Sequence, residues 1–156
     1  MEIILKIGDY AISNQIDDII KTYALGSCVA VTIYSERRKV LAMAHIALPD
    51  SQINPRKSKS NPTYFADTAI PFLLDKVYFE YGCVKEELTV RLFGGAKPTR
   101  KTDTFNVGER NIMAVKKVLT ECRLDWIAEE VGGAFGRTVA VAVATGIPQV
   151  NRYPLV

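Results

Sequence analysis

Two residues in the first third of the chain could together perform nucleophilic chemistry: Cys28, one of three cysteines, and His45, the only histidine. A cysteine attacks a carbonyl carbon as its thiolate, and a neighbouring imidazole can take the proton of the thiol. The pair therefore suggests an amide hydrolase in which Cys28 is the nucleophile and His45 the general base. Because the chain has no second histidine, any imidazole chemistry must pass through His45.

These two residues belong to two adjacent predicted strands. Residues 28–34 and 40–48 are rich in small and β-branched apolar side chains, and the polar, charged residues 35–39 between them predict a hairpin. In an antiparallel hairpin, the numbers of two directly opposed residues always have the same sum. A turn centred between residues 36 and 37 makes this sum 73, and 28 plus 45 is 73, so Cys28 would lie opposite His45. Directly opposed residues share a face, with Cβ atoms about 5 Å apart. A register shift of one residue would instead place His45 on the opposite face.

The residues around Cys28 agree with a catalytic role. Gly26 and Ser27 form a tight step before it, and the backbone N–H groups of Ser27 and Cys28 are expected to form an oxyanion hole. Thr22, on the preceding predicted strand, is expected to orient His45 and fix its tautomer without adding negative charge. The alternative for each residue is purely structural, since lone cysteines and histidines in apolar strands are often packing residues.

Composition and charge restrict the class of protein. The 156 residues fit one domain spanning residues 1–156, and 48% apolar with 24% charged residues is ordinary for a soluble globular protein. No apolar run is long enough for a membrane helix, and the N-terminus does not resemble a signal peptide. We therefore expect a cytoplasmic protein without membrane insertion.

Nucleic-acid binding and metal binding are not indicated. The net charge is +3, and the densest basic cluster, residues 56–59, has no interleaved aromatic side chains that could stack on bases. The spacing of Cys28, Cys83 and Cys122 matches neither a disulfide framework nor a zinc motif. We expect no metal and no cofactor, and we expect Cys83 and Cys122 to be packing residues.

The predicted elements give the fold class. Two main helices are expected, one from about residue 61 to residue 82 that Pro71 should kink or split, and one over residues 109–121. Residues 50–62 are expected to form a loop. Short apolar segments predict the strands, at residues 3–7, 21–25, 28–34, 40–48, 88–93, 124–131, 138–144 and 147–153. This order predicts an α/β (α+β) fold, with helices on one face of a mixed, largely antiparallel sheet.

Several motifs together resemble a known family. The segments L-G-S-C (residues 25–28) and A-H-x-x-L-P (residues 44–49) are similar to those of the chemoreceptor glutamine deamidases of the CheD family. The resemblance runs in family order through nearly the whole chain, at residues 22–31, 43–49, 64–67, 92–96, 107–111, 131–133, 136–137 and 144–146.

The resemblance implies both a fold and an activity. By motif, the catalytic cysteine, histidine and threonine of the family correspond to Cys28, His45 and Thr22. It implies a layered α/β/β fold and a protein-glutamine glutaminase, an amidohydrolase that converts glutamines of methyl-accepting chemotaxis receptors to glutamate through a thioester. Methylesterase activity on the same receptors and binding of the phosphatase CheC are further implications.

Two other functions remain open from the sequence. One is a regulatory adaptor that binds CheC or a receptor with little catalysis, and the other is a thiol hydrolase that acts on a different amide. Gly94 and Gly95 can be turn glycines or can let the backbone approach the site, and Asn111 can serve a cap or a buried polar network.

Overall fold

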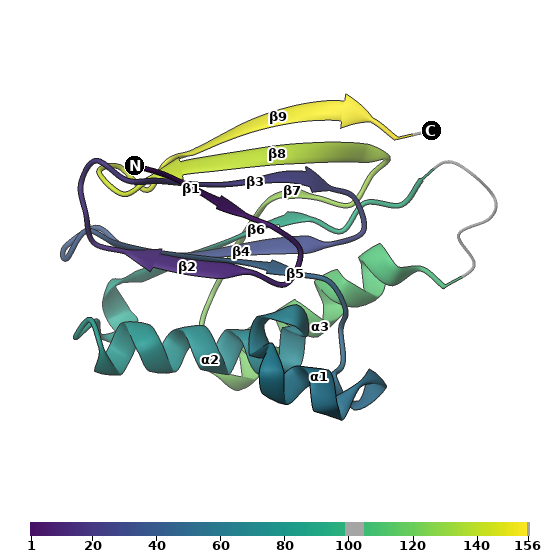
Figure 1. Ribbon diagram of the computed structural model, residues 1–156, viewed down its shortest axis with the longest axis horizontal. Coiled ribbons are helices and arrows are strands. Elements are labelled where there is room, and N and C mark those ends of the chain that lie inside the picture. The colour runs from purple at the N-terminus through teal and green to yellow at the C-terminus, as the bar shows by residue number, and fades with distance from the viewer. Residues whose placement is uncertain (99–104, 156) are drawn as a thin grey trace.

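The computed structural model describes residues 1–98 and 105–155 and has three layers, two stacked sheets and a layer of helices (Figure 1). In the order of their pairing, the outer sheet consists of β1 (Glu2–Leu5), β3 (Ile19–Leu25), β8 (Phe135–Ala142) and β9 (Pro148–Pro154). The inner sheet lies between the outer sheet and the helices. Its strands are β2 (Tyr10–Ser13), β5 (Val40–Ile46), β4 (Val29–Ser35), β6 (Leu88–Gly94) and β7 (Ile127–Val131).

The helices cover the free face of the inner sheet (Figure 1). They are α1 (Pro55–Ser60), α2 (Ala66–Phe79) and α3 (Val107–Glu121), with short 3-10 turns at Ser51–Ile53, Pro62–Tyr64 and Lys85–Glu87. The ladders β1–β3 and β6–β7 are parallel, and the other ladders are antiparallel. The predicted layered α/β/β arrangement with largely antiparallel sheets is therefore confirmed.

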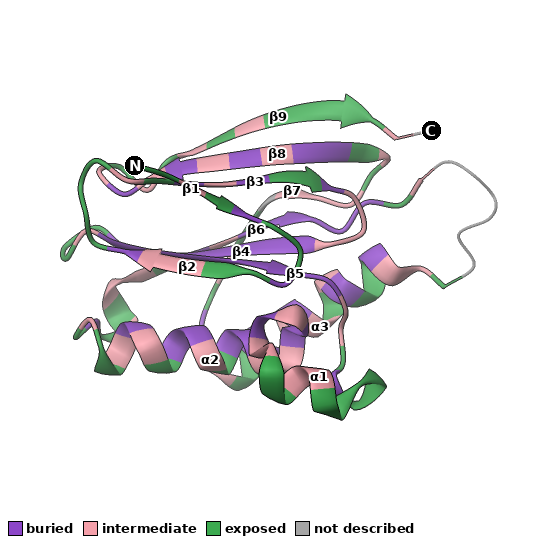
Figure 2. Cartoon of the chain, in the orientation of Figure 1, coloured by how far each residue is buried: buried purple, intermediate pink, exposed green. Residues whose placement is uncertain are grey.

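The layering explains the sequence of the two central strands. Every residue of β4 and β5 is buried, because one face of the inner sheet packs on the helices and the other on the outer sheet. A strand buried on both faces has a continuous apolar run and no polar alternation. Figure 2 shows the contrast with β9, where exposed residues predominate on the outermost strand.

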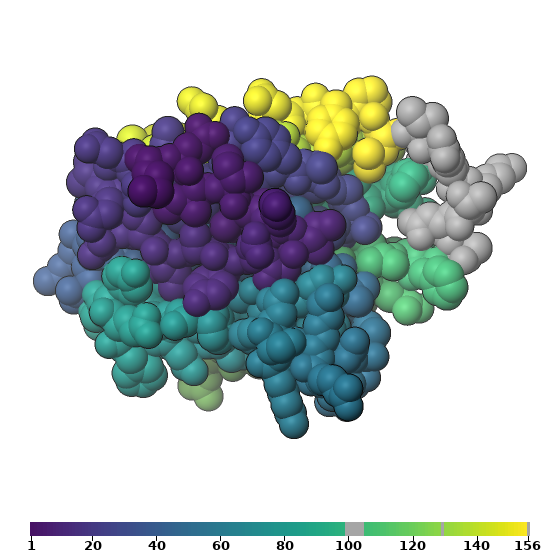
Figure 3. All heavy atoms as spheres, in the orientation of Figure 1, coloured from purple at the N-terminus to yellow at the C-terminus, as the bar shows by residue number. Residues whose placement is uncertain are grey.

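The N-terminal segment joins the two sheets. β1 belongs to the outer sheet and β2 to the inner sheet, and in Figure 3 these first residues cover the front of the molecule between the C-terminal strand and the helices. Their short connection, residues 6–9, brings Gly8 and Asp9 against β5. The Gly8 N–H donates to the His45 carbonyl at 2.8 Å, and the His45 N–H donates to the Asp9 carbonyl at 2.9 Å.

Two expectations about elements were wrong, and one strand was not predicted. The predicted loop of residues 50–62 contains α1, which Asn54 caps by accepting a hydrogen bond from the Lys57 N–H, with Pro55 in the first helical position. The long predicted helix begins at Ala66 and not near residue 61, and of the two effects expected of Pro71, a kink or a split, the split is excluded because α2 is continuous. The strand β2 has no counterpart among the predicted strands.

Candidate active site

The register of the β4–β5 hairpin differs from the predicted one by two residues. Ala30 pairs with His45 and Val29 with Ile46, so paired positions add to 75, and the turn is centred between residues 37 and 38. The expectation that Cys28 lies directly opposite His45 was therefore wrong. Because the shift is an even number of residues, however, His45 keeps the face that Ala30 and Cys28 share. Cys28 is a diagonal neighbour of His45, within reach of a side chain as long as imidazole.

That shared face points into the layer between the two sheets. Ala30 belongs to the apolar cluster between the sheets, and Cys28 packs against this cluster. His45 is 1% exposed, whereas Cys28 is only partly buried. The nucleophile candidate is thus accessible from solvent, and the base candidate is enclosed by protein.

Thr22 reaches across this layer from the outer sheet and contacts His45 on the inner sheet. Its hydroxyl oxygen lies 2.9 Å from the carbonyl oxygen of Leu5 and 2.7 Å from Nδ1 of His45. A hydroxyl has one hydrogen, which it donates to the Leu5 carbonyl, so it can only accept from His45. The proton of the neutral imidazole must then sit on Nδ1, and Nε2 carries the lone pair.

Nε2 of His45 is buried and has no hydrogen-bond partner within the described residues, Cys28 included. Burial lowers the pKa of His45 from 6.5 to about 4, although the Asp9 carboxylate partly opposes this shift. The structure therefore holds an uncharged imidazole with a free basic nitrogen, on the face that Cys28 shares but not hydrogen-bonded to it.

Burial also keeps the thiol of Cys28 uncharged. It raises the pKa of this thiol from 9.0 to about 11, because desolvation disfavours the thiolate. With the imidazole pKa near 4 and the thiol pKa near 11, the two groups are neutral at pH 7. At neutral pH, attack by the sulfur therefore requires that the thiol proton moves to His45.

In the segment that ends at Cys28, three successive carbonyl groups each accept a hydrogen bond. The Ala96 N–H donates to the Gly26 carbonyl at 2.8 Å, and the Gly95 N–H donates to the Cys28 carbonyl at 2.8 Å. Between them, the Asn111 side chain on α3 donates to the Ser27 carbonyl at 2.9 Å. The N–H groups of Ser27 and Cys28, in contrast, donate no hydrogen bond within the described part of the chain.

The Gly94–Gly95 turn supports Cys28 through a close approach of backbone. Gly94 has φ of 99°, and a Cβ atom there would collide with the Cys28 carbonyl oxygen. Only glycine satisfies both conditions. Of the two roles open from the sequence, turn glycine and close backbone approach to the site, Gly94 has both.

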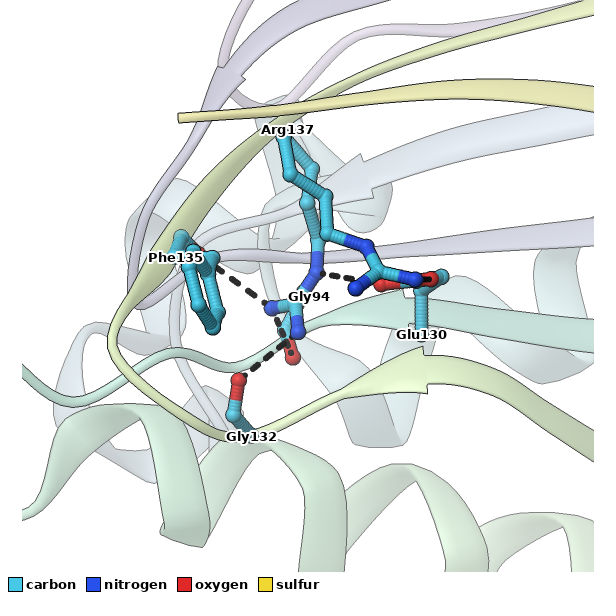
Figure 4. Close-up of polar contacts among 6 residues, drawn as sticks. Gly94, Glu130, Gly132, Phe135 and Arg137 are labelled. Atoms are coloured by element: carbon cyan, nitrogen blue, oxygen red, sulfur yellow. Dashed lines mark hydrogen bonds and ion pairs between the residues drawn. The ribbon is translucent and has the colours of Figure 1, made fainter. Parts of the chain in front are cut away.

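Arg137 on β8 binds Gly94 of this turn, as Figure 4 shows. Its guanidinium donates to the carbonyl oxygens of Gly132 at 2.8 Å and Gly94 at 3.4 Å, and its Nε pairs with Glu130 at 3.2 Å. The Gly132 N–H in turn donates to the Gly94 carbonyl at 2.8 Å. Arg137 is only 3% exposed. Its hydrogen bonds connect the outer sheet to the Gly94–Gly95 turn next to Cys28.

Asn111 and Arg137 were not predicted as site residues. The signal for Asn111 was its position four residues before Val115 and eight before Leu119, on the apolar stripe of a predicted helix. A polar residue on such a stripe needs buried partners, and the structure places Asn111 in the buried polar network that the sequence left open. The corresponding signal for Arg137 was its position as a charged residue at the start of an apolar strand.

The remaining cysteines lie elsewhere. Cys83 is buried in the apolar cluster between the helices and the inner sheet, and Cys122 packs against that cluster. Among the described residues, no group of three or more histidine, cysteine, aspartate or glutamate side chains is placed to hold a metal ion. No helix in the described ranges is both long and apolar enough to cross a membrane.

Comparison with known proteins identifies the family. A family described as "CheD chemotactic sensory transduction" matches residues 47–152. A probable chemoreceptor glutamine deamidase CheD of Syntrophotalea carbinolica is 45% identical over 152 residues, which cover 96% of this chain and 93% of that protein. The chain belongs to the CheD family.

Other relatives extend the CheD likeness. A probable chemoreceptor glutamine deamidase CheD 1 of Syntrophus aciditrophicus is 39% identical, over 93% of this chain and 90% of its own. A chemoreceptor glutamine deamidase CheD of Halalkalibacterium halodurans is 42% identical, over 77% of this chain and 75% of its own. The resemblance to CheD that the motifs indicated is thus confirmed over nearly the whole chain.

Proposed function

We propose that this CheD protein is a chemoreceptor glutamine deamidase that hydrolyses the side-chain amide of receptor glutamines to glutamate. The names of its relatives support this substrate class. One observation carries the assignment of the site: the Thr22 hydroxyl, already donating to the Leu5 carbonyl, leaves Nε2 as the basic nitrogen of His45. Cys28, which shares the face of His45, is the nucleophile on this proposal.

Acylation begins when the Cys28 thiol passes its proton to Nε2 of His45 and the sulfur attacks the glutamine carboxamide carbon. A bond forms between sulfur and carbon, and the carbonyl electron pair moves onto oxygen, where the N–H groups of Ser27 and Cys28 stabilise it. The protonated His45 then gives its proton to the amide nitrogen. The carbon–nitrogen bond breaks, ammonia leaves, and a thioester remains on Cys28.

Deacylation uses the same residues with water. Nε2 of His45 takes a proton from a water molecule, whose oxygen attacks the thioester carbon. The carbon–sulfur bond then breaks, the Cys28 sulfur recovers its proton from His45, and glutamate is released. Thr22 transfers no proton in either step and serves to orient the ring.

Three narrower predictions accompany this proposal. The same thioester route admits a glutamyl methyl ester, whose leaving group is methanol, so we propose methylesterase activity as a secondary reaction. Binding of CheC stays a prediction from the family resemblance, as does a cytoplasmic location.

The test is the mass of a receptor. A purified chemoreceptor cytoplasmic fragment incubated with the protein should gain about one dalton for each converted glutamine, since an amide nitrogen and its hydrogens are replaced by a hydroxyl group. Cys28→Ala and His45→Gln should abolish the gain. Cys122→Ala, which removes a partly exposed cysteine outside the site, is the matched control and should convert the receptor normally.

The adaptor alternative predicts a different result. An adaptor would bind the receptor fragment in a pull-down and leave its mass unchanged, with Cys28→Ala equal to the wild type. Conversion of glutamine in unrelated free peptides at the same rate as in the receptor would instead indicate a thiol hydrolase of another specificity. Either outcome would overturn the proposed function.

A further inference from the structure

Asn111 joins the two segments that carry the candidate nucleophile and base. Its side-chain Nδ2 donates to the Ser27 carbonyl at 2.9 Å and to the Ala47 carbonyl at 3.0 Å. Ser27 directly precedes Cys28, and Ala47 lies two residues after His45. Asn111 is 0% exposed, and both of its Nδ2 hydrogens are in use. Two carbonyl acceptors also settle which end of the amide is nitrogen.

The hydrogen bond to Ser27 determines the direction of the next N–H group. The described chain contains no cis peptide bond, so the plane between Ser27 and Cys28 is trans. In a trans peptide, the C=O and the N–H point in opposite directions. Because Asn111 holds the Ser27 carbonyl toward α3, the N–H of Cys28 must point away from this helix.

The Cys28 N–H has no acceptor in the part of the protein that the structure describes. It donates no hydrogen bond within the described residues, whereas the carbonyls of Gly26, Ser27 and Cys28 are all engaged. An N–H group whose direction is fixed before the reaction can stabilise the negative charge that develops on the substrate oxygen without first having to reorient.

We propose that Asn111 is a positioning residue, which orients the Ser27–Cys28 peptide so that the Cys28 N–H stabilises the oxyanion formed when Cys28 attacks a carbonyl carbon. This inference deepens the proposed function and rests on it for the identity of the nucleophile. It assigns Asn111 no contact with substrate and no proton transfer. Asn111 acts through the peptide that it holds.

The experiment compares two reactions of Cys28, one that forms an oxyanion and one that does not. Acylation by p-nitrophenyl acetate passes through an oxyanion and is followed as p-nitrophenolate release that Cys28→Ala lacks. Alkylation by iodoacetamide, mapped to Cys28 by mass spectrometry, is a displacement at carbon that forms none. Neither reaction uses a receptor, so the result does not depend on whether the protein deamidates receptors.

In Asn111→Asp, which keeps the shape but replaces both donors, the ratio of acylation rate to alkylation rate should fall about 10²-fold, the usual effect of losing one oxyanion donor. The alkylation rate should change by less than about threefold, because it depends on the thiolate fraction and on access. Asn111→Ala, which buries no carboxylate, should behave in the same way. It takes the place of Asn111→Asp in the experiment if that variant does not fold.

Controls separate this role from a general structural one. Asn151→Asp and Asn151→Ala make the same changes at an exposed position of β9 and should keep the wild-type ratio. Near-ultraviolet circular dichroism and thermal unfolding establish that each variant is folded. An unchanged ratio in a folded Asn111 variant would overturn the inference. A parallel loss of acylation and alkylation would overturn it as well, since Asn111 would then place the whole Cys28 segment.

Discussion

The hydroxyl group of Thr22 decides which nitrogen of His45 is basic. Thr22 has a single hydrogen to donate, and the Leu5 carbonyl at 2.9 Å takes it, so Nδ1 of His45 must be the donor in the 2.7 Å contact. A carboxylate at this position would fix the same tautomer, but it would also favour the charged imidazolium. Threonine orients the ring and leaves it neutral.

Replacing Thr22 tests this orientation. Thr22→Val should lower kcat for receptor deamidation by roughly 10- to 100-fold, part of the roughly 10²–10⁴-fold that general acid–base catalysis contributes. Thr22→Ser should keep most of the activity, since its hydroxyl can make both contacts. Thr32→Val replaces another buried threonine, on β4, and should leave kcat within about twofold of the wild type. Wild-type kcat in Thr22→Val would contradict the role.

The neutral thiol gives the free protein a distinctive pH profile. Because burial raises the pKa of Cys28 to about 11, the thiolate fraction should rise with pH throughout the neutral and alkaline range. Iodoacetamide alkylation of Cys28, mapped by mass spectrometry, should accelerate about tenfold for each pH unit from about pH 7 to about pH 10. A rate that levels off near neutrality would show a preformed thiolate–imidazolium pair and contradict this prediction.

Burial of neutral His45 also links folding to pH. Its folded pKa of about 4 lies below its ordinary value of 6.5, so between these values the unfolded chain binds a proton that the folded protein does not. The free energy of unfolding should therefore fall as pH decreases from 6.5 towards 4, by at most about 1.4 kcal/mol for each pH unit. Denaturant unfolding of His45→Gln should lack this part of the slope, and equal slopes for both proteins would count against a buried neutral imidazole.

Among the elements, the hairpin shows what a pattern can and cannot specify. The apolar runs predicted β4 and β5 and the charged turn, because strands buried on both faces must be apolar throughout. Face alternation distinguishes only registers that differ by an odd number of residues, so no apolar pattern could tell a sum of 73 from one of 75. The actual turn, residues 36–39, is centred between residues 37 and 38, one residue further along the chain than predicted, and this changes the sum from 73 to 75.

The helix start at α1 was missed for a related reason. The helix predicted from about residue 61 was placed there because Asn61–Pro62 is a typical N-cap followed by proline in the first turn, and Asn54–Pro55 carries the same signal. The structure uses the first pair to start α1 and the second to start a 3-10 turn ahead of α2. A local start signal is present at both positions, but packing against the inner sheet decided where the long helix begins.

The Gly94–Gly95 turn gives a prediction at this scale. In Gly94→Ala, the new methyl group must displace the Cys28 carbonyl, and we expect a loss of about 2–4 kcal/mol of stability with a large loss of deamidation. Gly132→Ala is the matched control, since Gly132 also has positive φ, of 74°, but a Cβ there meets nothing within 4 Å. It should cost about 1 kcal/mol, the backbone penalty alone. Equal unfolding free energies for the two variants would show that the close approach is unimportant.

For the molecule as a whole, Arg137 connects the layers that hold the site. It comes from the outer sheet and binds Gly94, Gly132 and Glu130 of the inner sheet and its adjoining turn (Figure 4). Glu130 also pairs with the exposed Arg152 of β9. The cysteine and histidine stand on the inner sheet and the threonine on the outer one, so the distance between sheets governs the Thr22–His45 contact.

Removing this connection should destabilise the protein. Arg137→Met leaves the partly buried Gly132 carbonyl without its side-chain donor and removes the buried one of the two arginines that pair with Glu130, and we expect a loss of about 2–4 kcal/mol in denaturant unfolding. Arg152→Met removes the exposed partner of the same carboxylate and should cost less than about 1 kcal/mol. If both variants lose equally, the buried arginine does not hold the layers together.

The sequence by itself determined the residue types that can do the chemistry, the family and the layered fold class. It placed Cys28 and His45 on one face correctly, because the shift in register was even and face alternates with a period of two. The tertiary structure alone decided the contacts that complete the site. Asn111 reaches Ser27 and Ala47 over 84 and 64 positions of sequence, and no local pattern encodes such distances. Only packing α3 and the outer sheet against the inner sheet brings these groups together, because a hydrogen bond forms over a few ångströms whatever the separation along the chain.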